Sequence, residues 1–406
     1  MNYNTHILSN GLKVIHIPSE SGVAHCGLLI NAGSRDEKDE EQGIAHFIEH
    51  LIFKGTRKRK AFHILSRMDD VGGEINAYTS KEETCIHTSF IKEEYTRALE
   101  LLSDIVSNSV FPVNEMDKER NVIIDEINSY LDNPAEAIYD DFEELIFKNQ
   151  PLGKNILGTP SNLKKFTKAD IENFISKNYT PDQMIVGFVG NINFTKLIRL
   201  VEKYFGAFKT NHSERTRIPF KGYTPLNHII KKNTNQAHCM IGTIAHDMYS
   251  PETYTMALLD NLIGGPGFNN RLNMLLREKL GYVYHVESNY TAYSDVGLFS
   301  VYFATEHQKL EKTIEYVMKE FKNLREKKLG TIQLSKAKKQ LYGQIAITAE
   351  NKSALMLSAS KSFLMKNKVE SLKNIHDKIE SITAENILET ANKVLYPENL
   401  SQLIYK

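Results

Sequence analysis

Apolar positions along the chain recur with two periods, which mark a succession of predicted strands and helices. Runs rich in β-branched residues that end at Gly, Ser or Pro predict strands, over 12–19, 23–34 and 184–192 in the first half. Apolar residues that recur three and four positions apart predict amphipathic helices. These helices cover approximately 41–53, 59–71, 93–110, 114–131, 135–147, 167–176 and 193–205.

The same order of elements recurs after a segment rich in Pro, Gly and charge, 210–224, which we interpret as a linker. The second half is predicted to contain a strand, two helices, a strand pair and long helices, over 236–246, 251–263, 269–280, 282–290, 297–305 and from 308 onward. Ala-His-Cys occurs at 24–26 and again at 237–239, inside a predicted strand each time. Together these features predict a duplicated α+β unit of about 200 residues. The expected domains are 1–209 and 225–406.

The predicted helix 41–53 carries three polar residues, His46, Glu49 and His50, in an otherwise apolar sequence. Residues three and four apart share a face of a helix, so these three side chains project from one patch. Burying two imidazoles and a carboxylate without partners costs several kcal/mol. The pattern therefore fits either a pair of core histidines with a charged neighbour or a Zn²⁺ site with an adjacent base. H-x-x-E-H is the inverted form of a zinc-peptidase motif.

The predicted helix 114–131 offers a third ligand. Asn114 is expected to cap it, and one face of it combines two carboxylates, Glu119 and Glu126, with apolar residues (Met116, Val122, Ile123, Ile127 and Tyr130). Like-charge repulsion and desolvation both oppose two inward carboxylates unless a cation is present. We therefore predict one Zn²⁺ per chain bound by His46, His50 and Glu126, with water as the fourth ligand. Glu49 is the expected general base, and Glu119 is expected to orient a ligand or the water.

Composition narrows the class of protein. Lys+Arg and Asp+Glu both number 50, so the formal net charge is zero. The overall charge therefore does not favour binding to nucleic acid or to an anionic membrane. The basic positions Lys54 and 57–60 are expected to form a solvated turn. Three scattered cysteines exclude a disulfide framework, and residues 1–20 lack the pattern of a secretion signal, so we expect a cytoplasmic protein.

Three segments, in order, resemble the pitrilysin family of zinc peptidases: "GIAHFIEHLIFKGT", "GGEINAYTSKE" and "KERNVIIDEI". The similarity extends through "IGGPGFNNRLNMLLREKLGYVYHV" in the second half, although many relatives have a Met-Ser-Ser run where this chain has "GGPGFNN". The family includes insulin-degrading enzyme, the mitochondrial processing peptidase and small bacterial homologues.

The resemblance implies roles for two further pairs of residues. Asn76 and Ala77 match the edge strand along which family members bind an extended substrate by β-augmentation. Arg277 and Tyr284 match a pair that stabilises the substrate carbonyl and its oxyanion. From the residues alone, a plain edge strand is equally compatible with Asn76 and Ala77. An exposed helical Arg near a helix end and a core Tyr are favoured over a functional pair for Arg277 and Tyr284.

The resemblance also implies an architecture and an activity. Each of two homologous units is expected to be a mainly antiparallel sheet covered by helices, and the units enclose a chamber like a clamshell. A homodimer with two composite sites follows, in which Arg277 and Tyr284 act on the zinc site of the partner. The expected function is a zinc-dependent endopeptidase for peptides or unfolded segments, either processing presequence-like peptides or clearing small ones. The alternative is a catalytically silent structural or peptide-binding member of the same fold.

Overall fold

The computed structural model describes residues 2–209 and 217–406, which divide into two compact units. Unit 1 comprises Met1–Ile127, Lys154–Arg217 and Ile347–Ser371, and unit 2 comprises Asn128–Gly153, Ile218–Ala346 and Leu372–Lys406. Residues 210–216 of the predicted linker lie outside the described residues, and 217–224 form neither helix nor strand. The predicted α+β class, with two sheets covered by helices, is confirmed.

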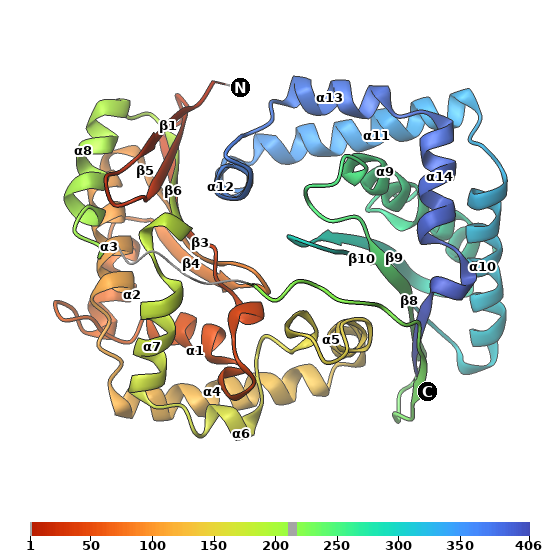
Figure 1. Cartoon of the computed structure of the whole chain (residues 1–406), viewed down its shortest axis with the longest axis horizontal. Helices are drawn as coiled ribbons and strands as arrows, with labels where there is room; N and C mark the ends of the chain where they lie inside the picture. The colour runs from red at the N-terminus through yellow and green to blue at the C-terminus, as the bar shows by residue number, and fades with distance from the viewer. Residues whose placement is uncertain (1, 210–216) are drawn as a thin grey trace. The chain divides into compact units, whose positions relative to one another are not determined.

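The described residues of unit 1 form a six-stranded sheet in the order β1-β2-β6-β3-β5-β4 (Figure 1). All of its pairings are antiparallel except β2 with β6. Its strands are β1 (Asn4–Ile7), β2 (Lys13–Pro18), β3 (Val23–Ile30), β4 (Glu74–Thr79), β5 (Thr84–Ile91) and β6 (Met184–Gly190). Its helices are α1 (Ile44–Leu51), α2 (Ala61–Asp69), α3 (Tyr95–Ser107), α6 (Pro160–Leu163), α7 (Lys168–Asn178), α8 (Phe194–Phe205), α12 (Lys352–Lys366) and the first part of α4 (Val113–Leu131).

Unit 2 repeats this topology with a five-stranded sheet in the order β7-β11-β8-β10-β9 among its described residues. The parallel pair β7–β11 corresponds to β2–β6, and Ala-His-Cys lies in the corresponding strands β3 and β8. The strands are β7 (Asn227–Ile230), β8 (Ala237–Ala245), β9 (Val283–Ala292), β10 (Gly297–Thr305) and β11 (Ser401–Tyr405). The helices are α5 (Pro134–Ile146), α9 (Thr253–Gly264), α10 (Leu310–Glu326), most of α11 (Thr331–Glu350), α13 (Leu372–Ser381), α14 (Ala384–Val394) and the π-helix η6 (Asn273–Lys279). The predicted duplication is therefore visible in strand order.

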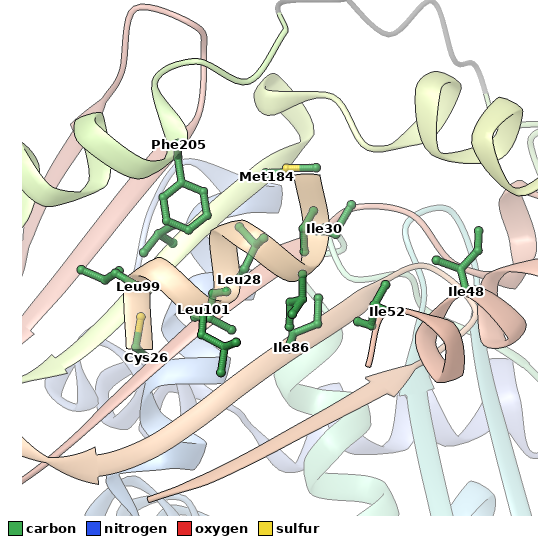
Figure 2. Packing of buried hydrophobic residues seen from close by; sticks show 14 of the residues in the cluster. Cys26, Leu28, Ile30, Ile48, Ile52, Ile86, Leu99, Leu101, Met184 and Phe205 are labelled. Atoms are coloured by element: carbon green, nitrogen blue, oxygen red, sulfur yellow. The ribbon is translucent and has the colours of Figure 1, made fainter. Parts of the chain in front are cut away.

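The central strands of each sheet are buried on both faces, which explains their nearly continuous apolar runs. Along β3, Leu28 and Ile30 join a core with α1, α3 and α8, whereas Leu29 packs toward α12 on the other face (Figure 2 shows the first core). In unit 2, Met240 of β8 packs toward α5, and Ile241 packs toward α9, α10 and α14.

The helices α5 and α12 are exchanged between the halves of the sequence. Residues 128–153 belong to unit 2, and residues 347–371 belong to unit 1, in contrast to the predicted domains 1–209 and 225–406. The physical reason is burial: the second face of each sheet is apolar, and a helix from the other half of the sequence covers it. Within the part of the chain that the structure describes, no helix has the length and apolar character of a membrane span.

Some predicted details were wrong. Helix α4 begins at Val113, so Asn114 lies in its first turn and does not cap it. The predicted helix 269–280 is a π-helix over most of its length, and it ends at Gly281, which has a φ of 61°. The short strands β1, β7 and β11 were not predicted.

Buried polar contacts fix the N-terminus of α1. The Glu37 carboxylate accepts hydrogen bonds from the main-chain N–H groups of Gly43 and Ala45, both at 2.9 Å. Gly43 has a φ of 96°, and a Cβ there would lie 2.7 Å from the Cα of Gly158. Burial raises the pKa of Glu37 to about 8, and the two N–H groups act in the opposite direction. The start of α1 is thus held by a carboxylate and by a close contact between two backbones.

Replacing Glu37 with alanine should lower the free energy of unfolding by about 2–4 kcal/mol, because two main-chain donors then lose their acceptor inside the core. Urea denaturation measures this change. Glu40→Ala is the matched control, since the Glu40 side chain is 74% exposed, and it should change stability by less than ~0.5 kcal/mol. Equal effects of the two substitutions would contradict the capping role.

Candidate metal centre and active site

Helix α1 presents both histidines from one side, as its sequence predicts. His46 and His50 are one turn apart, and their ring centroids are 4.7 Å apart. Most of the helix is buried, and His46 is only 8% exposed. Burial, and to a lesser extent the neighbouring His50, lower the pKa of His46 to about 3. His46 is therefore neutral at physiological pH, the state in which an imidazole nitrogen can bind a metal.

Glu126 of α4 meets these two histidines. Its Oε2 lies 3.9 Å from Nε2 of His46 and 3.7 Å from Nε2 of His50. Both distances are too long for a hydrogen bond. A tetrahedral zinc ion with bonds of about 2.0–2.1 Å holds its ligand atoms about 3.4 Å apart. Two imidazole nitrogens and one carboxylate oxygen at this spacing therefore fit a zinc ion, and within the described residues this is the one group of three or more such ligands.

Glu119 sets the orientation of His50. His50 Nδ1 donates to Oε2 of Glu119 at 3.1 Å, because a carboxylate oxygen can only accept. The proton on Nδ1 leaves the lone pair of Nε2 facing Glu126. The Glu119 side chain is only 7% exposed, so its carboxylate is a fixed, buried acceptor. Glu119 therefore contacts one of the predicted ligands, and its orienting role stays a prediction.

Lys54 neutralises the other oxygen of Glu119, with Nζ 2.7 Å from Oε1. The prediction of a solvated basic turn was therefore wrong for Lys54, and it was also wrong for Arg59, which pairs with Glu100 and Asp104. Lys54 lies beyond the end of α1 at Leu51, so no helical spacing links it to Glu119. The need of a buried carboxylate for a cationic partner explains why Lys54 is there.

Glu49 lies next to the histidines and accepts a hydrogen bond from Thr79 at 2.6 Å. Burial raises the pKa of Glu49, whereas the Thr79 hydrogen bond and the nearby His50 lower it. A carboxylate with a raised pKa is better matched to taking a proton near neutral pH. Sequence reasoning missed Thr79, because nothing in its spacing links it to α1.

The inward face of α4 is narrower than predicted. Met116, Glu119 and Ile123 are buried, as expected. Val122 and Tyr130 were predicted to point inward, but they are 48% and 37% exposed. The prediction assigned a wide face centred on Glu119, whereas the buried residues of α4 lie near the centre of that face.

Strand β4 carries Asn76 and Ala77 and lies at an edge of its sheet. Ser80 donates its N–H to Glu83 O at 2.8 Å, which makes the turn-closing pair a hydrogen-bonded one. Hydrogen-bonded and non-hydrogen-bonded pairs alternate along an antiparallel ladder. The pairs Thr79–Thr84 and Ala77–Ile86 are therefore non-hydrogen-bonded. By this alternation the main-chain groups of Ala77 and Thr79 face the open edge, whereas Asn76 can offer that edge its side chain.

Arg277 and Tyr284 lie in unit 2, on η6 and β9. The Arg277 guanidinium is 5.6 Å from the centre of the Tyr284 ring and 5.9 Å from that of Phe268. Tyr284 is 82% exposed and Phe268 is 79% exposed, so Tyr284 is not a core residue. The "GGPGFNN" loop that carries Phe268 is tied by Asn270, whose amide donates to the carbonyls of Gly265 and Gly267. Unit 2 thus displays a cation held between two exposed aromatic rings.

Two family models match the chain. One, described as "Insulinase (Peptidase family M16)", matches residues 13–160, and the other, "Peptidase M16 inactive domain", matches residues 165–341. A protein of Rickettsia felis named "Uncharacterized zinc protease" is 34% identical over 405 residues, which cover 99% of this chain and 97% of that protein. The chain belongs to peptidase family M16.

Other M16 relatives agree. A protein of Bacillus subtilis named "Uncharacterized zinc protease YmxG" is 30% identical, over 97% of this chain and 96% of its own length. The beta subunit of the mitochondrial-processing peptidase of Saccharomyces cerevisiae is 29% identical, over 98% and 90%. A crystal structure of a protease from Helicobacter pylori shares the fold with a TM-score of 0.92 at 22% identity, over 100% of this chain and 99% of that chain. The resemblance to pitrilysin-type zinc peptidases is confirmed.

The two halves of this M16 chain differ in chemistry. Helix α9 follows β8 and precedes β9, as α1 follows β3 and precedes β4. Its sequence, TYTMALLDNLIG, contains no histidine. The match of the second half to a model described as inactive agrees with this absence.

Substitutions should separate ligands from the residue that orients them. His50→Ala and Glu126→Gln should each abolish stoichiometric zinc binding, and Glu119→Gln should weaken it by about 10–100-fold. Competition with a chromophoric chelator measures the affinity. Asp125→Asn is the control on the same helix, because Asp125 is exposed, and it should bind zinc as the unmodified chain does. Unchanged affinity in Glu126→Gln would remove Glu126 from the ligand set.

Proposed function

We propose that this M16 family member is a zinc-dependent endopeptidase that hydrolyses peptides or unfolded segments. One observation carries the proposal: Nε2 of His46, Nε2 of His50 and an oxygen of Glu126 converge at metal-ligand spacing beside the carboxylate of Glu49. The names of the relatives, zinc proteases and a processing peptidase subunit, support zinc and peptide-bond hydrolysis.

Side chains and main-chain groups of the protein have separate roles in the proposed reaction. Bound zinc would lower the pKa of a water and polarise the scissile carbonyl. Glu49 takes a proton from the attacking water and then passes it to the leaving amine. The open edge of β4 holds the peptide by main-chain hydrogen bonds to Ala77, with the Asn76 side chain beside it. Arg277 and Tyr284 donate hydrogen bonds to the developing oxyanion of the peptide.

Glu49→Gln should retain zinc and peptide binding but lower kcat by a factor on the order of 10²–10⁴, because the amide cannot take the proton. Cleavage of a quenched fluorogenic peptide, with and without chelator, measures turnover. Glu93→Gln, at an exposed position, should leave kcat unchanged. A Glu49→Gln chain with a normal rate would exclude Glu49 as the base.

The same assay tests the second candidate function, a catalytically silent peptide-binding or structural member. The match of the second half to an "inactive domain" model favours this candidate, whereas the complete set of His46, Glu49, His50 and Glu126 opposes it. Peptide binding without any chelator-sensitive cleavage would decide for the silent member.

The proposal includes a homodimer in which Arg277 and Tyr284 serve the zinc centre of the partner. Two findings support it. The three candidate zinc ligands belong to unit 1, whereas Arg277 and Tyr284 belong to unit 2. One relative is named as a subunit of a processing peptidase. The resemblance adds that heterodimeric relatives carry the zinc motif and the Arg/Tyr pair on different chains.

Mixing a His50→Ala chain with an Arg277→Ala chain should restore part of the activity, because a hybrid dimer contains one complete composite site. Native mass spectrometry verifies that the mixed dimers form, and peptide cleavage measures the rescue. The control mixes two separately purified batches of His50→Ala and should show no rescue. If hybrid dimers form without rescue, action across the dimer is wrong.

A further inference from the structure

Thr79 connects the edge strand β4 with the carboxylate of Glu49. Its hydroxyl donates to Oε2 of Glu49 at 2.6 Å, from the last residue of β4 to the last turn of α1. Alternation along the strand places Thr79 on the same face as Ile75 and Ala77, which pack against the core that contains α1. Tyr78, between them, packs on the opposite face, toward α12.

This hydrogen bond restricts how the Glu49 carboxylate can point. A glutamate has three side-chain torsions, and in the absence of a partner its carboxylate samples several orientations. A short hydrogen bond to an ionised carboxylate is stronger than a neutral one. Because Oε2 is occupied by the Thr79 hydroxyl, Oε1 is left to take a proton from the attacking water.

The main chain of Thr79 has a separate task. Thr79 pairs with Thr84 in a non-hydrogen-bonded position, so its N–H and C=O face the open edge of the sheet. An extended peptide that adds to this edge would bond to these groups as well as to those of Ala77. One residue thus faces the peptide with its backbone and the base with its side chain.

We propose that Thr79 is a positioning residue that orients Glu49 and couples the docking of a peptide on β4 to the alignment of the base. The inference rests on the proposed peptidase function. The hydrogen bond from Thr79 to Glu49 forms without a peptide. A peptide strand that adds to β4 would hold the end of that strand in place, and with it the hydroxyl bonded to Oε2.

The test compares three variants of the full chain. Thr79→Val keeps the β-branched shape and the main-chain groups but loses the hydroxyl, whereas Thr79→Ser keeps the hydroxyl. Thr88→Val is the control, because the Thr88 hydroxyl lies in the adjacent strand and donates to Glu74 O, away from Glu49. The measurements are kcat and KM on a quenched fluorogenic peptide, zinc content, and the visible absorption of the cobalt(II)-substituted protein.

Thr79→Val should lower kcat by about 10-fold or more with KM changed less than about twofold, because misalignment affects the proton transfer and not the binding. Thr79→Ser and Thr88→Val should retain kcat within about threefold. Zinc content and the cobalt(II) spectrum should be the same in all variants, since the metal ligands are untouched. A defect caused only by loss of structure would instead appear in these two readouts or in Thr88→Val as well.

The remaining outcomes overturn the inference or the function beneath it. If Glu49→Gln is inactive and Thr79→Val has a normal kcat, the inference alone is wrong. If Thr79→Val raises KM and leaves kcat unchanged, Thr79 binds substrate and does not position the base. If Glu49→Gln remains fully active, or the unmodified chain cleaves no peptide, the proposed function fails and the inference fails with it.

Discussion

The meeting of two imidazoles with carboxylates in a largely apolar interior is the interaction on which the rest of this structure depends. His46 is almost fully buried and neutral, and Glu119 is buried in contact with His50 and Lys54. Each of these groups alone would oppose folding. Together they form a set in which Lys54 and His50 hold Glu119, and His46 and His50 converge with an oxygen of Glu126. Glu37 holds the start of α1, and Glu119 links α4 to His50 of the same helix.

The sequence was most informative where the chemistry follows a single helix. Spacing along α1 predicted that His46, Glu49 and His50 share one side, and two carboxylates on the apolar face of α4 indicated Glu126 and Glu119. These predictions needed only helical geometry and the cost of burial. The broad fold was predictable for a similar reason, because two periods of apolar residues recur in the same order in both halves.

Other features could not be predicted because they depend on tertiary packing. Thr79, Lys54 and Glu37 act through partners brought close by folding, and no periodic pattern marks them. The exchange of α5 and α12 could not be predicted, because the apolar pattern of an amphipathic helix does not identify the sheet against which the helix packs. The strands β1 and β7 have only four residues each, too few for an alternating pattern to stand out. The exposure of Val122 shows that a helical face predicted from spacing can be wider than the part of the helix that is buried.

The reciprocal exchange of α5 and α12 has a consequence for biosynthesis. The ribosome releases the strands of the first sheet long before residues 352–366, yet those residues cover one of its faces. Until then Ile15, Ile17 and Leu29 remain open to water on a nascent chain. The two halves of the sequence therefore cannot fold one after the other as independent domains. Unit 1 is completed only once residues 347–371 have been made, whereas α5 already precedes every strand of unit 2 in the chain.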